Sequence, residues 1–404
     1  MQNKLLLSTL SYAYNNTDYY KKLFNENNIK INSYKDLEKI PLLSKEIIKK
    51  NFSKLISKKY NIEYLIKKKT GGSTGEPLEF YCNSYSGLFD YGHHSYLCSL
   101  MGHKKGDIII SCGGVNIPEH LLCKNIYWVE IKKGNPFGDY IFSVLHLSNN
   151  NINIYVDKII EMQPAILRGY PSFFNSLANH ILKHNITLPF KIKGIILTAE
   201  MCSTNQQLNI EKAFSSMVYF EYGHTEVCLF CYTKDKTYTY ESSPIYGYIE
   251  ILNDDGSETK IGQIGNIIVT GFINMAMPFI RYKTGDLAKL KYRNAGVVYF
   301  DEFQGRQQSY ALSKNKKKVY LNTMIFGLLA ENLKRVLKWQ IIQHKIGELE
   351  FYIIKTKDFS KKDELNIEKV IKNVIDLEIN FIYVEIIPPT KNGKHLFFIQ
   401  NISP

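Results

Sequence analysis

Two short apolar segments without polar alternation constrain the fold of this 404-residue chain more than any other feature of its sequence. They occupy residues 107–114 and 194–198, and both are rich in isoleucine. Apolar side chains on both faces are typical of strands in a parallel sheet that is covered on both sides. An amphipathic helix is expected between them at 172–184, and a further strand at 217–220. This order of elements predicts an α/β core.

The sequence changes character after Tyr238, where short strands at 246–252, 265–270 and 288–292 are expected to alternate with turns. These strands predict a β-rich subdomain attached to the α/β core with its parallel sheet. Because the chain is too long for one compact core, we expect a large N-terminal domain over 1–305 and a small, mobile α+β domain over 306–404. The elements expected in the small domain are a helix at 323–337, a strand at 349–355, a helix at 363–375 and a strand at 380–387.

The net charge of +13 raises the question of a nucleic-acid or anionic membrane surface. The excess of lysine is spread along the chain, and in residues 1–69 it fits the solvated face of the helices expected there. We therefore expect no nucleic acid among the partners. Since no apolar stretch is long enough for a transmembrane helix or a signal peptide, we expect a cytoplasmic protein. The oligomeric state stays open, with a dimer among the alternatives.

The seven cysteines are scattered along the chain, and their odd number argues against a disulfide framework. A reducing compartment fits this pattern. Cys228 and Cys231 have the spacing of half a zinc site, but no second pair of ligands lies near them in the sequence. Small buried side chains are the favoured interpretation, and a metal site is the alternative.

A loop rich in glycine and hydroxyl residues is the first candidate binding site, and its sequence is Thr70-Gly71-Gly72-Ser73-Thr74-Gly75-Glu76-Pro77. The backbone N–H groups of such a loop can turn toward an anion, and glycine lets phosphate oxygens approach closely. The lysines at 67–69 would raise the positive potential beside it. The loop is not a Walker A sequence, because no Gly-Lys-Ser/Thr closes it. Taken alone, it is equally compatible with an ordinary surface turn.

Three later segments carry polar residues that suit a nucleotide. Tyr222-Gly223-His224-Thr225-Glu226 follows an expected strand, where a tyrosine can stack on a base, a threonine can bond phosphate and a glutamate can bind Mg²⁺. Asp286, which ends Arg281-Tyr282-Lys283-Thr284-Gly285-Asp286, can accept hydrogen bonds from a ribose diol. Gly393-Lys394 places a flexible ammonium group on a turn, where it can neutralise phosphate charge.

Together these segments resemble the ANL superfamily of adenylate-forming enzymes, and most closely its phenylacetate–CoA ligase-like and CapK-like branch. Further matching motifs are Gly169-Tyr170-Pro171-Ser172, Thr198-Ala199-Glu200 and Gly305-Arg306. Each motif is weak by itself, but all of them appear in the family's order and together they cover nearly the whole chain. The resemblance implies a hinge near Arg306 and a small mobile lid that carries a catalytic lysine.

The resemblance also implies which residues surround ATP or AMP: Thr70, Gly71, Gly72, Ser73, Thr74, Gly75, Ala199, Glu200, Tyr222, Gly223, His224, Thr225, Asp286 and Arg306. In the family's arrangement the loop would cradle the phosphates. Ala199, Glu200 and Tyr222 would flank the adenine, while Asp286 and Arg306 would hold the ribose.

The catalytic residues implied by the resemblance are Thr225, Glu226 and Lys394. Thr225 and Lys394 would contact the α-phosphate, and Glu226 would bind Mg²⁺. Tyr170 and His224 are candidates for the pocket of the acyl substrate, although packing roles are common for histidines, including the pair His93–His94.

The implied activity is an ATP-dependent ligase that converts a small carboxylic acid to an acyl-adenylate and pyrophosphate. The acyl group would then pass to an amine or hydroxyl acceptor, such as an amino acid or amino sugar, as the CapK-like proteins of surface-polysaccharide pathways imply. Coenzyme A is the alternative acceptor. It is less well supported, because Gln308 stands where CoA-using members often have an acidic residue or lysine, and 314–318 lacks the glycine often seen there.

A further alternative is a non-catalytic nucleotide-binding protein of the same fold. The presence of Glu226, Asp286 and Lys394 together favours an enzyme.

Overall fold

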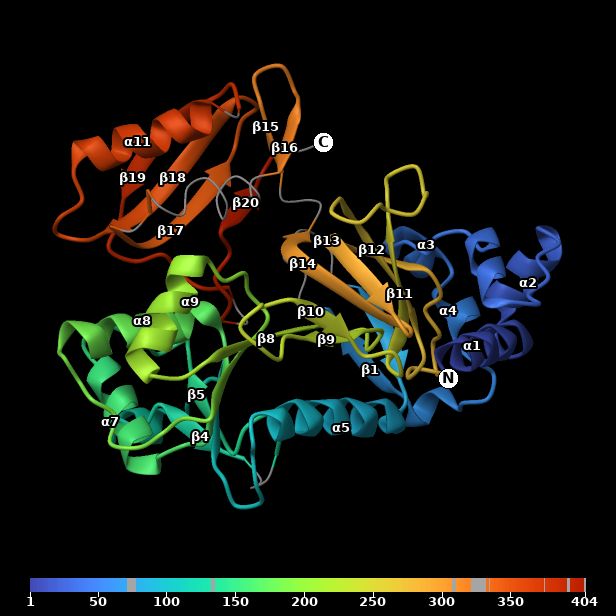
Figure 1. Cartoon of the computed structure of the whole chain (residues 1–404), viewed down its shortest axis with the longest axis horizontal. Helices are drawn as coiled ribbons and strands as arrows, with labels where there is room; N and C mark the ends of the chain where they lie inside the picture. The colour runs from blue at the N-terminus through green and yellow to red at the C-terminus, as the bar shows by residue number, and fades with distance from the viewer. Residues whose placement is uncertain are drawn as a thin grey trace. The chain divides into compact units, whose positions relative to one another are not determined.

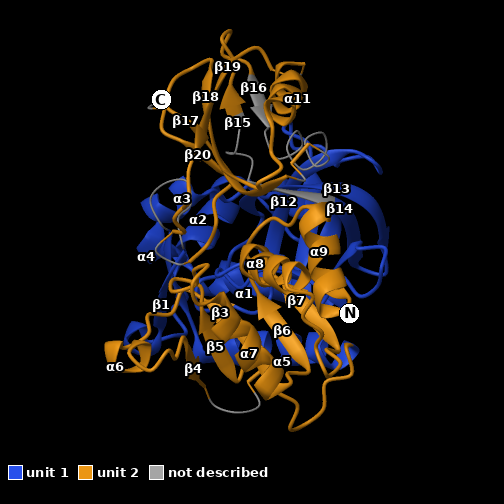
Figure 2. Cartoon of the chain, turned by 90° about the vertical axis from the view of Figure 1, so that its left-hand side faces the viewer, with its two compact units in different colours: residues 1–100, 219–303 blue, residues 101–218, 304–404 orange. Residues whose placement is uncertain are grey.

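The computed structural model describes residues 1–70, 78–131, 135–306, 310–320, 332–333, 335–373, 375–390 and 393–402, without the side chains of 302–306, 310 and 318–320. The chain forms two compact units, each made of two separate stretches (Figure 2). Unit 1 comprises Met1–Leu100 and Tyr219–Phe303, and unit 2 comprises Met101–Val218 and Gln304–Pro404. Helices and sheets occur in both units, which confirms the α/β class predicted from the sequence.

Unit 1 begins with short helices. Their bounds are α1 (Gln2–Asn16), α2 (Asp18–Glu26), η1 (Tyr34–Lys39), α3 (Lys45–Lys50), α4 (Phe52–Leu55) and η2 (Ile62–Tyr64). Thr17 caps α2 and Ser44 caps α3, because each side chain accepts a backbone N–H of the first turn. None of the helices in the described ranges has a segment that could span a bilayer.

The lysine-rich N-terminal segment is not helical to its end, contrary to the prediction. Ile66–Lys69 form strand β1, which pairs antiparallel with β2 (Glu79–Cys82). Lys67 and Lys69 both lie near the carboxylate of Glu79, with N–O distances of 2.8 and 3.6 Å. After β2 comes α5 (Ser84–Leu100), which Figure 1 shows as a long straight helix.

The second stretch of unit 1 is a β-rich sheet, as predicted. Its strands are β8 (Val218–Gly223), β9 (Phe230–Tyr232), β10 (Tyr240–Ser242), β11 (Gly247–Leu252), β12 (Ile264–Gly271), β13 (Tyr282–Asn294) and β14 (Val297–Arg306), in the spatial order β11-β12-β13-β14-β10-β9-β8. β8 is longer than predicted and pairs antiparallel with β9. Tyr222 and Gly223 therefore lie inside a strand and not after one.

Arg281 connects the N-terminal helices to this sheet. Its guanidinium donates to both carboxylate oxygens of Glu250 on β11, at 3.1 and 2.9 Å, and to the carbonyls of Glu38 and Ile40, at 2.9 and 2.8 Å. The backbone N–H of Leu43 donates to the carbonyl of Arg281, and the carbonyl of Leu43 accepts the N–H of Lys283. Leu43 therefore pairs with the start of β13 on both sides of Tyr282. Because the buried cation has a partner at each of these donors, the start of β13 has one well-defined position.

Unit 2 contains the predicted parallel sheet. Its strands are β3 (Ile109–Gly113), β4 (Trp128–Glu130), β5 (Tyr140–Ser143), β6 (Ile166–Gly169) and β7 (Gly194–Leu197), in the order β7-β6-β3-β5-β4. All neighbours are parallel except β4, which pairs antiparallel with β5 at the edge. The helices are α6 (Glu119–Leu122), α7 (Ile152–Met162), α8 (Pro171–Lys183) and α9 (Thr204–Phe214). The strands predicted at 107–114 and 194–198 and the helix at 172–184 are confirmed.

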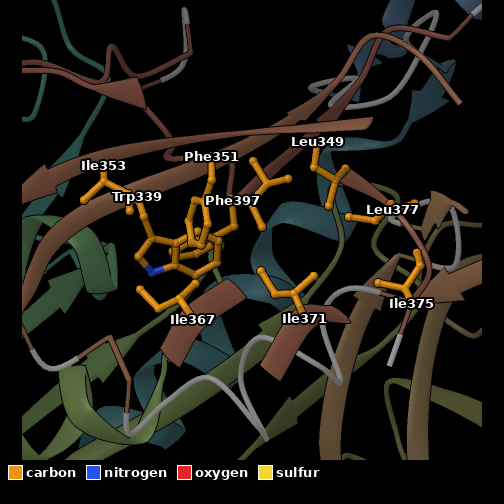
Figure 3. Close-up of a cluster of buried hydrophobic side chains, with 11 residues drawn as sticks. Trp339, Leu349, Phe351, Ile353, Ile367, Ile371, Ile375, Leu377 and Phe397 are labelled. Carbon is orange, nitrogen blue, oxygen red and sulfur yellow. The ribbon is translucent and has the colours of Figure 1, made fainter. Parts of the chain in front are cut away.

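The C-terminal part of unit 2 is a small α+β body. Its elements are β15 (Tyr310–Leu312), β16 (Lys318–Tyr320), β17 (Val336–Gln343), β18 (Glu348–Lys355), α11 (Lys361–Lys372), β19 (Glu378–Tyr383) and β20 (Phe398–Gln400). A four-stranded sheet in the order β19-β18-β17-β20 packs against α11. Ile367 and Ile371 of the helix meet Trp339, Phe351 and Ile353 of the strands in a buried cluster (Figure 3).

The helix predicted at 323–337 lies largely outside the described residues, and its last two positions are wrong because β17 begins at Val336. Trp339, Ile341 and Gln343 are all buried, at the two-residue spacing of a strand with one face toward the core. The strand predicted at 349–355 and the helix at 363–375 are confirmed, whereas the strand predicted at 380–387 ends at Tyr383.

The Arg281–Glu250 pair gives a stability prediction. Replacing Arg281 by Lys removes the planar donor array and leaves the buried carboxylate of Glu250 poorly paired. We expect the free energy of unfolding to fall by about 3 kcal/mol in chemical denaturation. The same substitution at the exposed Arg335, which pairs with Asp363, should change it by less than about 1 kcal/mol. Equal effects at the two sites would contradict this interpretation.

Candidate active site

The residues expected to contact a nucleotide fall into two groups, one in each unit. Unit 1 holds Thr70, Tyr222, Gly223, His224, Thr225, Glu226 and Asp286; unit 2 holds Tyr170, Ala199, Glu200 and Lys394. The loop residues Gly71, Gly72, Ser73, Thr74 and Gly75 lie outside the described residues, and so does the side chain of Arg306. The roles given to them remain predictions.

Thr70 joins the two ends of the predicted phosphate loop. Its backbone N–H donates to the carbonyl of Leu78 at 2.9 Å, and its hydroxyl accepts from the N–H of Leu78 at 2.9 Å. Thr70 is buried, so these bonds are protected from water. Thr70 and Leu78, which flank the predicted loop, are therefore held together beside the paired strands β1 and β2.

Tyr222, His224 and Asp286 form one hydrogen-bonded cluster, although Asp286 is remote from the other two in sequence. The hydroxyl of Tyr222 donates to Asp286 Oδ2 at 2.7 Å and lies 2.7 Å from His224 Nε2. His224 Nε2 is also 3.3 Å from Asp286 Oδ2. Burial, together with the neighbouring charge of Asp286, raises the pKa of Tyr222 well above its usual value, so the phenol keeps its proton.

This cluster determines the tautomer of His224. Because the single proton of the Tyr222 hydroxyl goes to Asp286, His224 Nε2 must carry a proton and donate it toward these oxygens. The other ring nitrogen, Nδ1, is then an acceptor if the imidazole is neutral. It is buried and has no hydrogen-bond partner among the described residues. An unpaired buried acceptor of this kind suits a donor group on a bound ligand.

A bulge in β13 sets the position of Asp286. Between the pairs Asn266–Leu287 and Ile268–Lys283, strand β13 has extra residues that β12 lacks, and Gly285 there has φ +84°. The hydroxyl of Thr284 accepts the N–H of Asp286 at 3.0 Å and donates to the carbonyl of Ile267 at 2.8 Å. A glycine at the left-handed position allows this irregularity, which directs Asp286 toward Tyr222.

Glu226 and Thr225 follow directly after β8. Glu226 is buried, and the hydroxyl of Tyr282 donates to its Oε1 at 2.9 Å. Burial raises the pKa of Tyr282, so that hydroxyl remains a donor. Thr225 is exposed, and its side chain is accessible to a ligand. The residue after Glu226, Val227, has φ +57°, a costly conformation for a β-branched residue that is often found at functional sites.

The carboxylate of Glu226 is a ligand type that suits a magnesium ion held partly by phosphate oxygens. In the described ranges, no three His, Cys, Asp or Glu side chains are grouped as a complete metal site. Magnesium does not need one, since it is commonly held by one or two carboxylates together with substrate phosphates. The second carboxylate oxygen of Glu226 would serve as such a single protein ligand.

The group in unit 2 stands at the carboxyl ends of parallel strands. Tyr170 follows β6, Ala199 and Glu200 follow β7, and Val144 follows β5. This edge of an α/β sheet is the usual place for a ligand. Ala199 has φ +67°, a left-handed conformation outside glycine that orients the next residue. Burial raises the pKa of Tyr170 to about 12, and its N–H donates to the Cys112 thiol at 3.1 Å.

Glu200 links this edge to the C-terminal part of the same unit. Its Oε2 accepts the backbone N–H of Ser172 at 3.1 Å, in the first turn of α8, and its Oε1 accepts the backbone N–H of His395. Burial raises the pKa of the Glu200 carboxyl, while the bonds from His395 and Ser172 act in the opposite direction. Sequence reasoning placed Glu200 beside the adenine and did not foresee this contact with the segment that carries Lys394.

Lys394 lies in a tight turn. The hydroxyl of Thr390 accepts its N–H at 3.1 Å, and Thr390 N–H donates to the carbonyl of Lys394 at 2.9 Å. Gly393 before it has φ +76° and packs so closely that an added Cβ would lie 2.2 Å from Val144 Cγ2 and 3.1 Å from Gly114 Cα. The turn therefore packs against the residues that follow β3 and β5, within unit 2.

His395 was not predicted as a site residue from the sequence. It is buried, and its Nε2 lies 2.8 Å from the carbonyl of Trp339, which requires a proton on Nε2. Burial and the nearby charge of Lys338 lower its pKa to about 3. His395 therefore stays neutral at physiological pH, and its backbone N–H is the group that reaches Glu200. Only its position next to a candidate lysine could have drawn attention to it.

The remaining sequence candidates have packing roles. His93 is held between the carbonyl of Phe89 at 2.9 Å and the hydroxyl of Ser243 at 3.0 Å. His94 Nδ1 lies 3.0 Å from Glu221, the residue before Tyr222, and so supports the strand that carries the cluster. Cys228 and Cys231 are free and buried, and burial raises the pKa of both thiols.

The chain is similar to known proteins along its whole length. A family model described as the CapK C-terminal domain matches residues 312–401. The chain is 29% identical over 416 residues to Protein CapK of Staphylococcus aureus, covering 100% of this chain and 89% of that protein. It is 23% identical over 312 residues to the phenylacetate-coenzyme A ligase of Pseudomonas putida, covering 70% of this chain and 64% of that protein.

Solved structures confirm the fold class. A 2-hydroxyisobutyryl-CoA ligase in the postadenylation state, in complex with 2-HIB-AMP, has a TM-score of 0.75 and 15% identity, covering 98% of this chain and 88% of that one. An anthranilate CoA ligase in complex with anthranoyl-AMP has a TM-score of 0.52 and 14% identity, covering 84% and 67%. At these identities the likeness concerns the arrangement of the backbone.

The close packing of Gly393 gives a prediction for the lysine turn. Gly393→Ala would press its Cβ into Val144, so the segment 393–395 must move and the His395–Glu200 bond must weaken. We expect faster hydrogen–deuterium exchange of the His395 amide, by about tenfold or more for a loss of about 1.4 kcal/mol. The double variant Val144→Ala/Gly393→Ala removes the contacting methyl group and should restore part of the protection. Unchanged exchange in the single variant would rule out this packing.

Proposed function

Because the chain resembles the CapK-like branch of the adenylate-forming ANL superfamily along its whole length, we propose that it is an AMP-forming ligase. It activates a small carboxylic acid with ATP and transfers the acyl group to an amine or hydroxyl acceptor. The observation that carries the proposal is the buried cluster of Tyr222, His224 and Asp286 beside Glu226. Residues distant in sequence are brought together there, and the cluster includes a buried ring nitrogen, His224 Nδ1, that has no partner among the described residues.

In the first step, a carboxylate oxygen of the acid bonds to the α-phosphorus of ATP, and the bond from that phosphorus to the bridging oxygen breaks. Pyrophosphate leaves with the electron pair. Both reactants are anionic, so positive charge near the α-phosphate lowers the barrier. Lys394 supplies this charge, and the exposed hydroxyl of Thr225 donates a hydrogen bond to an α-phosphate oxygen. Magnesium, when bound through Glu226, offsets phosphate charge.

The other motif residues position the nucleotide. We assign the glycine-rich loop, with Ser73, Thr74 and Gly75, to the phosphates, and Asp286 and Arg306 to the ribose. We assign Tyr222, Ala199 and Glu200 to the adenine. Glu200 also accepts the hydrogen bond of His395, which holds the lysine turn in place. We also retain the division into an adenylation domain at 1–305 and a lid at 306–404, with the hinge near Arg306.

In the second step, a nitrogen or oxygen of the acceptor attacks the acyl carbonyl. The bond from the acyl carbon to the phosphate oxygen breaks, AMP leaves, and the acceptor loses a proton. An amino acid or amino sugar fits the CapK-like resemblance, and a role in surface-polysaccharide synthesis in the cytoplasm is part of this proposal. The second candidate is a CoA ligase, supported by the similarity to the Pseudomonas putida enzyme and by the fold shared with CoA ligases.

The test is ATP–pyrophosphate exchange with a panel of carboxylic acids. Exchange that depends on one class of acid would support adenylation, whereas tight ATP binding without exchange would support a non-catalytic protein of the same fold. Adding CoA, amino acids or amino sugars to an active mixture then identifies the acceptor by product mass. A thioester of CoA would replace the amine or hydroxyl acceptor in this proposal.

Lys394→Ala separates the two half-reactions. We expect the exchange rate to fall by about 10²–10³, the usual effect of removing one charge-stabilising group from a transition state. Transfer from a chemically prepared acyl-adenylate should stay within about threefold of the wild type, because no charge builds on ATP in that step. Lys357→Ala, at an exposed position of the same unit, is the matched control. Equal loss of both half-reactions would contradict the role given to Lys394.

Glu226→Gln tests the magnesium ligand. Glutamine can still accept the hydrogen bond of Tyr282, but it lacks the negative charge that binds the cation. We expect the magnesium concentration for half-maximal exchange to rise about tenfold or more, with partial recovery of the rate at high magnesium. Tyr282→Phe keeps the carboxylate and should shift this concentration less. An unchanged magnesium dependence in Glu226→Gln would remove Glu226 from the metal site.

A further inference from the structure

The outward face of α5 is a feature that the proposed function leaves unexplained. Tyr85, Leu88 and Tyr96 are 60%, 68% and 51% exposed, and Phe89 beside them is 36% exposed. With Gly92 these residues follow the spacing i, i+3, i+4, i+7 and i+11, so they form one stripe along the helix. Apolar side chains that are exposed in a continuous patch usually mark an interaction surface.

The stripe forms one wall of a groove. The opposite wall consists of Tyr232 on β9 and of Ser243, Pro244 and Ile245 after β10, and the space between them is about 610 Å³. At its base, His93 Nε2 and the hydroxyl of Ser243 lie 3.0 Å apart and satisfy each other. The described residues that line the groove include no Asp, Glu, Lys or Arg, although charged residues make up 22% of the chain.

The occupant of this groove is elongated and apolar. A site for a small molecule encloses most of its ligand, whereas more than half of the Tyr85, Leu88 and Tyr96 side chains is accessible to solvent here. An open apolar groove of this kind matches a helix that presents apolar side chains at i, i+3, i+4 and i+7. The stripe on α5 has this pattern itself, so the α5 helix of a second copy is a helix of the kind that such a groove accepts.

Gly92 marks the place where two such helices can approach closely. Glycine within a helix costs about 1 kcal/mol relative to alanine. No atom lies within 4 Å of the position that a Cβ on Gly92 would occupy, so no described neighbour in this chain requires the small residue. A helix from outside, crossing over Gly92, would require it. The α5 sequence contains a single charged residue, Asp90, which accepts a hydrogen bond from Tyr246 in the interior.

We propose that this face of α5 is the interface of a two-fold symmetric homodimer, in which the two α5 helices cross at Gly92. The chain has a net charge of +13, so two copies repel each other over most of their surface. The uncharged stripe is a surface on which two copies can pack against each other without bringing their lysines together. A two-fold axis at Gly92 places Leu88 against Tyr96 of the partner subunit, and the same contact occurs twice.

The full chain is examined by sedimentation equilibrium over a wide range of concentrations. We expect a dimer for the wild type, and Leu88→Glu should raise its dissociation constant by at least about 30-fold, because a charge enters the interface in both subunits. Ile261→Glu changes an isoleucine that is 71% exposed on the turn between β11 and β12, and it should leave the dimer intact. A monomeric wild type, or a Leu88→Glu dimer of unchanged affinity, would overturn the proposal. Circular dichroism checks that both variants are folded.

Disulfide formation tests the crossing point independently. In a Cys123→Ser background, which removes an exposed native thiol, one chain carries Leu88→Cys and the other carries Tyr96→Cys. Mixing the two and oxidising should give a covalent dimer at a rate at least about tenfold above that of either variant alone, because position 88 faces position 96 of the partner subunit and not position 88. A mixture that cross-links no faster than the separate variants would reject the crossing at Gly92.

Discussion

The two hydrogen bonds to the buried carboxylate of Glu200 hold together the part of the chain that carries the candidate lysine. A carboxyl group taken out of water loses solvation energy, which raises the pKa of Glu200, and donors that replace the water act in the opposite direction. Here the donors are backbone N–H groups of Ser172 and His395, which lie far apart in sequence. Ser172 stands in the first turn of α8, where the helix also favours negative charge. Without Glu200, two backbone donors, one of them on the buried residue His395, would lose their partner.

The candidate residues of both units have two features in common: neighbours fix their polar atoms, and the backbone within or next to them has an uncommon conformation. Ala199, Val227 and Gly285 all have positive φ, and each stands directly before, after or within a segment proposed to contact the nucleotide. For the two non-glycine residues such conformations cost energy and persist only when surrounding contacts determine them. The bond of Tyr282 to Glu226, the residue before Val227, is a contact of this kind, and the bonds of Thr284 hold the bulge around Gly285.

The sequence predicted the elements whose pattern is local. The buried parallel strands, the amphipathic α8 and the short strands after Tyr238 follow from periodicity and turn residues, and the family motifs selected most residues of both groups. The first two residues of β17, Val336 and Leu337, were predicted as the end of a helix. A short apolar run is compatible with the period of a helix and with that of a strand, and here the pairing with β18 decides between them. The contacts of Glu200 and His395 depend on how distant segments fold together, so no local pattern encodes them. The same holds for the cluster of Tyr222 with Asp286, whose members were selected separately.

Helix α5 relates the proposed dimer contact to the candidate site inside unit 1. Its outer face is the apolar stripe, whereas its inner face carries His94, which lies between Asp90 on the same helix and Glu221 on β8. Glu221 is followed directly by Tyr222, the centre of the cluster with His224 and Asp286. A shift of α5 along its axis would therefore strain a buried hydrogen bond one residue away from the site. A partner that covers the outer face restrains α5 from the other side, and in doing so it stabilises the position of the strand that presents Tyr222.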